Sequence, residues 1–136
     1  MIHLQSNQRL YISEDLRGYV DKLIDDGTIP YAVDFLQLGF AHAVQEELEP
    51  ATDSERHTIT TNTEILGSAK PVIEAVAQWY AREISYGVPD DSNQLLSLIC
   101  DTSIAGGRRL RRHWKGRSKT QIQNTIHHLL KNKTST

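Results

Sequence analysis

Cysteine is almost absent from this chain of 136 residues, and long apolar runs are absent altogether. Cys100 is the only cysteine, so an internal disulfide is excluded and a cysteine-based zinc site is disfavoured. No stretch reaches the roughly 18 apolar residues that a membrane-spanning helix needs. The N-terminal stretch MIHLQSNQRL lacks a basic region followed by an apolar one, which argues against a secretory signal. These absences predict a cytoplasmic protein that does not associate with membranes.

The motifs of common cofactor and catalytic sites are missing as well. No GxGxxG, phosphate loop, CxxC, HExxH or GxSxG pattern occurs. The six histidines are scattered, and the adjacent His127 and His128 would point about 100° apart on a helix, which prevents them from holding one metal ion together. His42 lies in an apolar segment and is typical of a core histidine. We therefore expect no metal, no cofactor and no catalytic residues.

Acidic residues are missing from the C-terminal part of the chain, and this splits it into two oppositely charged parts. All 17 acids lie between Glu14 and Asp101, so residues 1–105, with only six Lys and Arg, carry a net charge of −11. Residues 106–136 hold nine Lys and Arg and no acid, a net charge of +9. Such asymmetry is typical of a surface for nucleic acid or an acidic partner. The alternative is that the basic end folds back on the acidic body and neutralises it through weak surface ion pairs.

Apolar periodicity predicts a mainly helical single domain over residues 1–136, with about five helices and a short N-terminal strand. A strand-helix-helix part covers residues 1–49, a polar loop with a short strand covers 50–63, and a helical part with the basic end 106–136 covers 64–136. The predicted elements are a strand over 8–13, helices over 14–26 and 30–48, a strand over 58–61, and helices that begin near Pro71, Ser92 and Ser118.

Several local signals refine this layout. Gly27 can take the left-handed conformation that ends a helix, and residues 118–121 have the pattern of a capping box. The pair Gly106-Gly107 predicts a hinge, a helix cap or a close helix crossing. Residues 31–48 are apolar on more than one side, which indicates either a central core helix or the interface of a homo-oligomer.

The stretch GGRRLRRHWKGRSK, residues 106–119, holds seven of the nine Lys and Arg of the basic end, and we call it the basic block. If it continues a helix through residue 114, its cations gather on one face, while Leu110 and Trp114 anchor another face to the core. Guanidinium donors match phosphate oxygens, and only one aromatic residue interrupts the block, so we predict phosphate contacts without sequence readout. The candidate contact residues are Arg108, Arg109, Arg111, Arg112, Lys115, Arg117 and Lys119.

The first 45 or so residues resemble the ribbon-helix-helix layout of strand, helix, turn and helix. Proteins of that type are dimers that read the major groove with a two-stranded ribbon. The resemblance implies that Arg9 and Tyr11 face outward on the ribbon. It also implies a second functional class, a sequence-specific transcriptional repressor.

The spacing from Arg108 to His113 resembles the R-x4-6-H motif of the HEPN ribonucleases, which are small helical proteins. That resemblance implies an arginine that holds the scissile phosphate and a histidine that transfers a proton. A block with four arginines before one histidine also produces this spacing by chance. A basic helix that happens to contain a histidine is therefore the alternative interpretation.

The whole layout is similar to the DndE family, small accessory proteins of bacterial DNA phosphorothioation. The similar parts are ISEDL at the start of the first helix, GTIPY at the turn into the apolar second helix, a PDD break, and SIAGGRRLRRHW, within residues 10–115. The family is helical, oligomeric and associated with DNA binding through Lys and Arg surfaces, alongside larger enzymes. Its first helix is typically basic, whereas RGYVDKLIDD here is balanced to acidic. The resemblance then implies that DNA contacts moved to residues 108–119.

Together these observations predict a small, non-catalytic DNA-binding accessory protein in DNA modification or phage defence. We expect it to hold the DNA phosphate backbone through the Arg-rich helix and to form a homo-oligomer through helix 31–48. The alternatives are a ribbon-helix-helix repressor, a protein-interaction subunit of a larger complex, and an HEPN-like ribonuclease.

Overall fold

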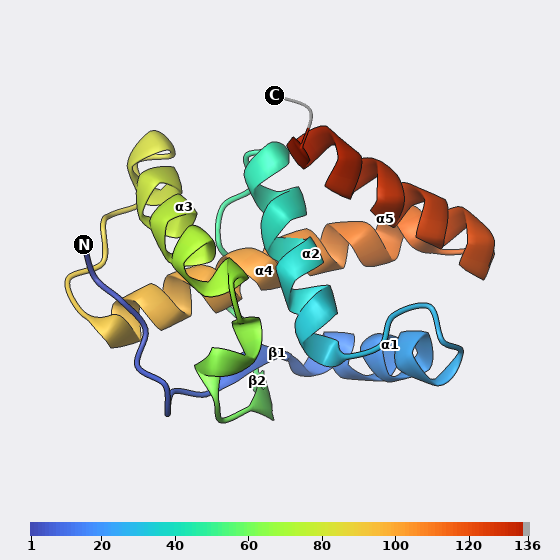
Figure 1. The fold of residues 1–136 in the computed structure, drawn as a ribbon, viewed down its shortest axis with the longest axis horizontal. Helices are drawn as coiled ribbons and strands as arrows, with labels where there is room; N and C mark the ends of the chain where they lie inside the picture. Colours follow the sequence, from blue (N-terminus) through green and yellow to red (C-terminus); the bar gives the residue numbers. More distant parts are fainter. Residues whose placement is uncertain (135–136) are drawn as a thin grey trace.

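The longest helix, α4 (Ser92–Trp114), runs across the width of the molecule, and helices α1 to α3 pack along it (Figure 1). The computed structural model describes the backbone of residues 1–134 and the side chains of residues 1–127. Lys131 and Lys133 of the basic end therefore lie outside the described side chains. The other elements are β1 (Leu10–Ser13), α1 (Glu14–Asp25), α2 (Ala32–Gln45), β2 (Arg56–Thr60), a short 3₁₀ helix η1 (Thr63–Leu66), α3 (Ala69–Glu83) and α5 (Lys119–Thr134). The predicted mainly helical fold with a short N-terminal strand is confirmed.

Helices α2 and α4 cross in direct backbone contact. A Cβ atom on Gly106 would overlap the carbonyl oxygen of Gly39, and one on Gly39 would overlap the carbonyl oxygen of Ser103. Only glycine lets two helix backbones approach this closely. Of the three alternatives for Gly106-Gly107, the close helix crossing is the one that the structure shows.

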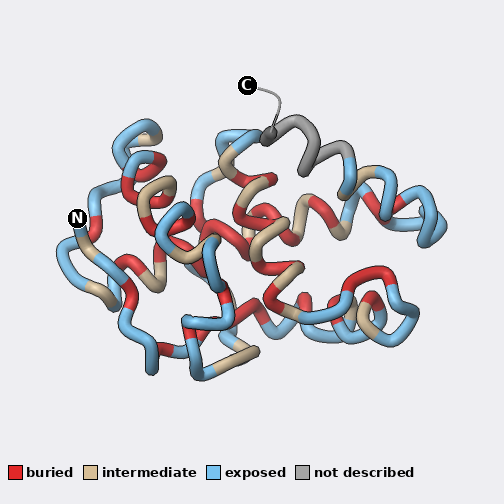
Figure 2. Tube along the Cα trace, viewed as in Figure 1, coloured by how far each residue is buried: buried red, intermediate tan, exposed pale blue. Residues whose placement is uncertain are grey.

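Helix α2 is the centre of the hydrophobic core. Phe35 and Leu36 are buried, as are Phe40 and Ala43 one and two turns later, and Figure 2 shows buried segments facing each other along α2 and α4. The apolar sides of this helix are thus largely covered within one chain. Helix α2 is thus a central core helix, as one of the two alternatives for residues 31–48 predicts, and a homo-oligomer through the same segment stays a prediction.

Strand β1 pairs with β2 of the same chain in an antiparallel two-stranded sheet, with Ile12 opposite His57. All four residues of β1 are buried. Tyr11 is 3% exposed, and its hydroxyl donates a hydrogen bond to Asp101 Oδ1 on α4 at 2.8 Å. The prediction that Tyr11 faces outward on a ribbon was wrong, because β2 and α4 cover the strand. Arg9 is exposed but precedes β1.

The ends of two helices follow the local sequence signals. Gly27 has φ +77° directly after α1, as a left-handed helix end requires. At the start of α5, the backbone N–H of Gln121 donates to Ser118 Oγ at 3.2 Å, and the Ser118 N–H donates to Gln121 Oε1 at 2.8 Å. The predicted capping box is therefore present. In the part of the chain that the structure describes, we find no helix with the length and apolar character needed to cross a membrane.

Candidate nucleic-acid interface

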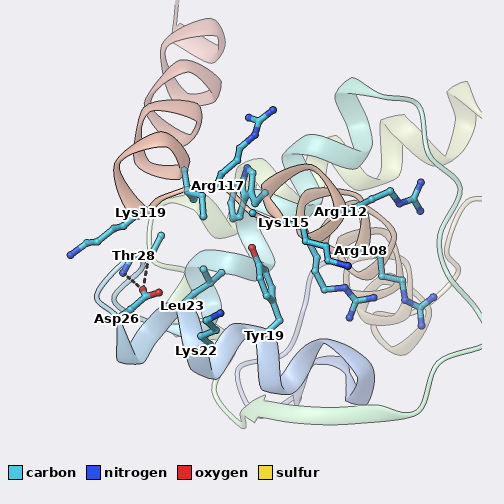
Figure 3. A pocket seen from close by; sticks show the side chains of 14 residues that line it. Tyr19, Lys22, Leu23, Asp26, Thr28, Arg108, Arg112, Lys115, Arg117 and Lys119 are labelled. Carbon is cyan, nitrogen blue, oxygen red and sulfur yellow. Dashed lines mark hydrogen bonds between the residues drawn. The ribbon is translucent and has the colours of Figure 1, made fainter.

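A cavity of about 620 Å³ lies where the C-terminal end of α4 meets α1 and the start of α5 (Figure 3). We call it the basic cavity, because half of the side chains that line it are cationic. The apolar residues of its lining are Tyr19, Leu23, Trp114 and Ile122, of which the last three are at most 5% exposed. The cations that line it are Lys22, Arg108, Arg111, Arg112, Lys115, Arg117 and Lys119. The structure thus brings six of the seven predicted basic residues to one cavity, together with one cation that the sequence analysis missed.

Local structure explains how these cations come to line one cavity. Leu110 and Trp114 are each 1% exposed, so they anchor the last turns of α4 in the core, as predicted. The chain then reverses at Gly116, which has φ +79°, and α5 begins at the capping box. The Nζ atom of Lys119 lies 3.2 Å from where a Cβ on Gly27 would be, so this lysine rests on the turn that ends α1.

Arg108 is held by acidic and polar groups of the N-terminal half. Its Nη2 donates to Asp15 Oδ1 at 2.9 Å and its Nε donates to Asp15 Oδ2 at 3.2 Å, a two-point contact with one carboxylate. Its Nη1 lies 3.4 Å from Asp53 Oδ1, and Nη2 also donates to Ser54 Oγ at 3.0 Å. Arg108 therefore lines the cavity with its charge already compensated.

Arg111 shares the same carboxylate. Its Nη1 donates to the Asp15 carbonyl oxygen at 2.8 Å, and its Nη2 lies 3.4 Å from Asp15 Oδ2. The hydrogen bond from Arg108 lowers the pKa of Asp15 to about 2, and the charges of Arg108 and Arg111 act in the same direction. The same contact raises the pKa of Arg108. Self-neutralisation, the alternative to a partner surface, thus holds for these two arginines.

The remaining cations of the block have no such partner. No carboxylate oxygen among the described side chains lies within 4.0 Å of Arg109, Arg112, Lys115, Arg117 or Lys119, and no acid follows Asp101 in the sequence. Figure 3 shows Arg112 and Lys119 extending to opposite sides of the cavity. Four of these five cations, Arg112, Lys115, Arg117 and Lys119, line the basic cavity.

Two residues of the cavity lining each carry a buried polar atom that has no hydrogen-bond partner among the described residues. The Tyr19 hydroxyl and the Trp114 indole nitrogen are buried, and neither is paired with any group that the structure describes. An unmatched buried donor of this kind costs on the order of 1–3 kcal/mol. Burial raises the pKa of the Tyr19 hydroxyl, the nearby charge of Asp26 raises it further and that of Arg111 opposes the rise, so the group is a neutral donor. Figure 3 shows the hydroxyl directed from α1 toward the turn that holds Lys115.

Arg109 and His113 lie outside the lining of the basic cavity. The His113 ring packs edge-on against the ring of His42 on α2, with 5.7 Å between their centroids. Burial lowers the pKa of His42, and the charges of His113 and Arg109 act in the same direction against the opposing charge of Glu46. Arg108 contacts Asp15 whereas His113 contacts His42, so the structure gives the two residues of the R-x4-H spacing no common partner.

The sequence analysis did not identify Lys22 and Tyr19 as site residues. They are three positions apart on α1, so they share one face of a helix that is acidic at both ends. The three-residue spacing shows that Tyr19 and Lys22 lie on the same side of α1. Nothing in the sequence indicates that this side meets the end of α4.

Comparison of the chain with protein-family models, with curated proteins and with solved structures finds no match. Among the described residues, no group of three or more His, Cys, Asp or Glu side chains could hold a metal ion.

Proposed function

We propose that this protein binds nucleic acid through its phosphates and carries out no chemistry of its own. One observation carries the proposal: five cations of residues 109–119 have no carboxylate partner among the described residues, although the same chain holds 17 acids. A protein that needed only internal neutralisation would pair these cations as it pairs Arg108. Free guanidinium and ammonium groups, four of which line one cavity, are instead suited to a phosphate backbone.

The number of free cations gives the salt dependence that we expect for this binding. Each phosphate that a cation neutralises contributes about −0.9 to the slope of log K against log salt concentration. Arg108 and Arg111 already contact Asp15 and release no counterions from the ligand. If Lys22 and the five free cations of the block all contact a duplex, the slope approaches about −5. Binding should differ little among unrelated sequences, since phosphate contacts carry no sequence information.

Fluorescence anisotropy with labelled duplex and single-stranded DNA, over a series of salt concentrations, tests this proposal. We expect Arg112→Met to weaken binding and to make the slope shallower by about 0.9. Arg82→Met is the matched control, because Arg82 is an exposed arginine of α3, which lies away from the basic cavity (Figure 1). Absence of binding at low salt, or an affinity that salt leaves unchanged, contradicts the proposal.

A narrower role in DNA modification or phage defence is supported by the resemblance to the DndE family. The repressor alternative requires Arg9 to determine sequence preference, and Arg9→Ala with specific and unrelated duplex competitors tests it. RNA of the same length, incubated with wild type and His113→Ala, tests the ribonuclease alternative. Cleavage that depends on His113 would replace the non-catalytic proposal.

The interaction-subunit alternative is favoured by one specific observation on α3. Val72 and Trp79 are 58% and 52% exposed and lie seven positions apart, hence on the same helix face. Contact between two copies of this chain would use a surface of the same kind. Sedimentation velocity of wild type and Trp79→Ser tests this, and equal monomeric profiles would argue against self-association through α3.

A further inference from the structure

Helix α3 carries an apolar face that the described residues leave open. The helix lies on the side of the molecule where α4 begins, away from the basic cavity at the other end of α4 (Figure 1). Val72 and Trp79 are 58% and 52% exposed, and the half-buried Ala75 and Val76 lie between them on the same side. We propose that this α3 face binds the α3 face of a second copy of the chain, with the two helices antiparallel.

The spacing of the apolar residues suits an antiparallel pair. In a contact between two identical surfaces, a twofold axis relates the copies. If the axis passes beside Ala75, Trp79 of each copy packs on Val72 of the other, and the two small alanines lie at the crossing. A large side chain thus meets a smaller one on both sides of the axis. Ile65 in η1 and Tyr86 after α3, at 50% and 43% exposed, flank the two ends of the helix.

The charges at the ends of α3 favour the same arrangement. The first turn of α3 has no acidic residue, and Ser68 before it makes no side-chain cap hydrogen bond. Lys70 in that turn already pairs with Glu64 at 2.6 Å. Glu83 in the last turn is exposed, follows Trp79 by four positions and has no ion pair among the described residues.

An antiparallel pair brings these two ends together. It places Glu83 of one copy beside Ser68 of the other, where the positive end of the helix dipole stabilises a carboxylate. By symmetry this contact occurs twice in a dimer. A parallel pair would instead bring the two Glu83 carboxylates close to each other, where they repel.

Sedimentation velocity of the full chain, without nucleic acid, tests the association. One pair of helices buries less surface than a typical stable dimer, so we expect a dissociation constant on the order of 100 µM. The average sedimentation coefficient should therefore rise between about 5 and about 500 µM protein. A monomer over this whole range would overturn the proposal.

A substitution at Glu83 tests the charged contact. Glu83→Gln should weaken the association about tenfold, because each of the two symmetric contacts loses a carboxylate worth about threefold. Glu55→Gln is the matched control, since it removes the charge of an exposed glutamate that lies outside α3 and has no ion pair among the described residues. Equal effects of the two substitutions would overturn the contact between Glu83 and the partner helix.

Tryptophan fluorescence locates the contact on α3. The chain has two tryptophans, and Trp114 is 1% exposed, so acrylamide quenches mainly the emission of Trp79. Quenching should decrease as the protein concentration rises through the range in which sedimentation shows association. Association with unchanged quenching would place the contact elsewhere and would overturn the proposal.

Cysteine cross-linking tests the direction of the two helices. In the antiparallel pair, Ala75→Cys places two thiols beside the axis, where oxidation joins them. Arg82→Cys is the matched control, because position 82 lies seven positions further along the same side of α3 and about 20 Å from its symmetry mate. Cys100 is buried, and wild type measures any background from it. Equal cross-linking at positions 75 and 82 would indicate a parallel pair or random collision and would overturn the antiparallel arrangement.

These measurements separate this inference from the proposed function, because none of them uses nucleic acid. If the chain associates through α3 but binds no DNA, the inference stands and the proposed function fails. If DNA binds while the free chain stays monomeric and position 75 forms no cross-link, the proposed function stands. The inference then fails, and the α3 face does not bind a second copy.

Discussion

Residues 106–119 contain two arginines that pair with Asp15 and five cations that have no carboxylate partner among the described residues. Replacing Asp15 tests this division most directly. Its carboxylate accepts two hydrogen bonds from Arg108, at 2.9 and 3.2 Å, and lies 3.4 Å from Arg111. The substitution Asp15→Asn keeps the size of the side chain but removes the charge that compensates both arginines. We expect it to lower the free energy of unfolding and, at the same time, to strengthen nucleic-acid binding.

The loss of stability follows from the pKa of this carboxyl. A fall from the ordinary 3.8 to about 2 corresponds to roughly 2.4 kcal/mol, at 1.36 kcal/mol for each pH unit. The side chain is 41% exposed, and solvent screening of such a partly open pair reduces the contribution to about 1 kcal/mol. Urea denaturation at neutral pH should therefore show Asp15→Asn less stable than wild type by about that amount.

The difference in free energy of unfolding between wild type and Asp15→Asn should depend on pH. The pKa of Asp15 is lower in the folded protein than in the unfolded chain, so its stabilisation is complete above about pH 4 and is lost as the pH falls toward about 2. The difference between wild type and Asp15→Asn should shrink over the same range. A difference that stays constant down to pH 2 would show that the ion pair is not its source.

Nucleic-acid binding should change in the opposite direction to stability. Asp15→Asn releases Arg108 and Arg111 to contact phosphates, which can steepen the salt slope by as much as about 1.8. Asp21→Asn is the matched control, because Asp21 is an exposed acid of the same helix with no ion pair among the described residues. Equal gains in nucleic-acid affinity from the two substitutions would indicate a general effect of net charge. They would refute the idea that Asp15 holds Arg108 and Arg111 away from phosphates.

Three further predictions concern the core. Gly106→Ala should destabilise the protein by about 3 kcal/mol or more in chemical denaturation, because the new methyl group overlaps the backbone of Gly39 and neither helix can give way cheaply. Burial raises the pKa of the Cys100 thiol to about 12, so a thiol reagent at pH 8 should modify it only after urea unfolds the chain, and fast labelling of the native protein would contradict this. Burial lowers the pKa of His42, so stability should decline as the pH falls through the ordinary histidine range, and His42→Phe should lack that part of the decline.

Structural features that depend on residues close together in the sequence could be predicted. Periodicity located the helices, and the left-handed Gly27 and the hydrogen bonds between Ser118 and Gln121 ended or began them as expected. The four-residue spacing of Leu110 and Trp114 correctly indicated the buried side of the last turns of α4. In each case the decisive interaction spans at most four positions, so the sequence contains all of it.

The environment of β1 could not be predicted in the same way. Alternation over residues 8–13 indicates a strand with one open face, and the ribbon-helix-helix resemblance placed Tyr11 on that face. In the structure Arg56 of β2 lies 4.3 Å from the centre of the Tyr11 ring, and Asp101 of α4 accepts its hydroxyl hydrogen bond. These partners lie 45 and 90 positions away, and only tertiary packing brings them to the strand.

The division of the basic block also arises from tertiary packing. Gly107 has no side chain, and a Cβ there would lie 3.2 Å from Leu16 Cδ1, so α1 and α4 meet closely at this pair. Arg108 follows Gly107 and Asp15 precedes Leu16, hence the two charged residues are neighbours across the contact. Arg111 lies one turn further along α4 than Arg108 and reaches the same carboxylate. Arg112 is rotated about 100° from Arg111 around the helix axis and has no carboxylate partner among the described residues. The register of one helix contact thus decides which arginines pair with Asp15 and which have no carboxylate partner among the described residues.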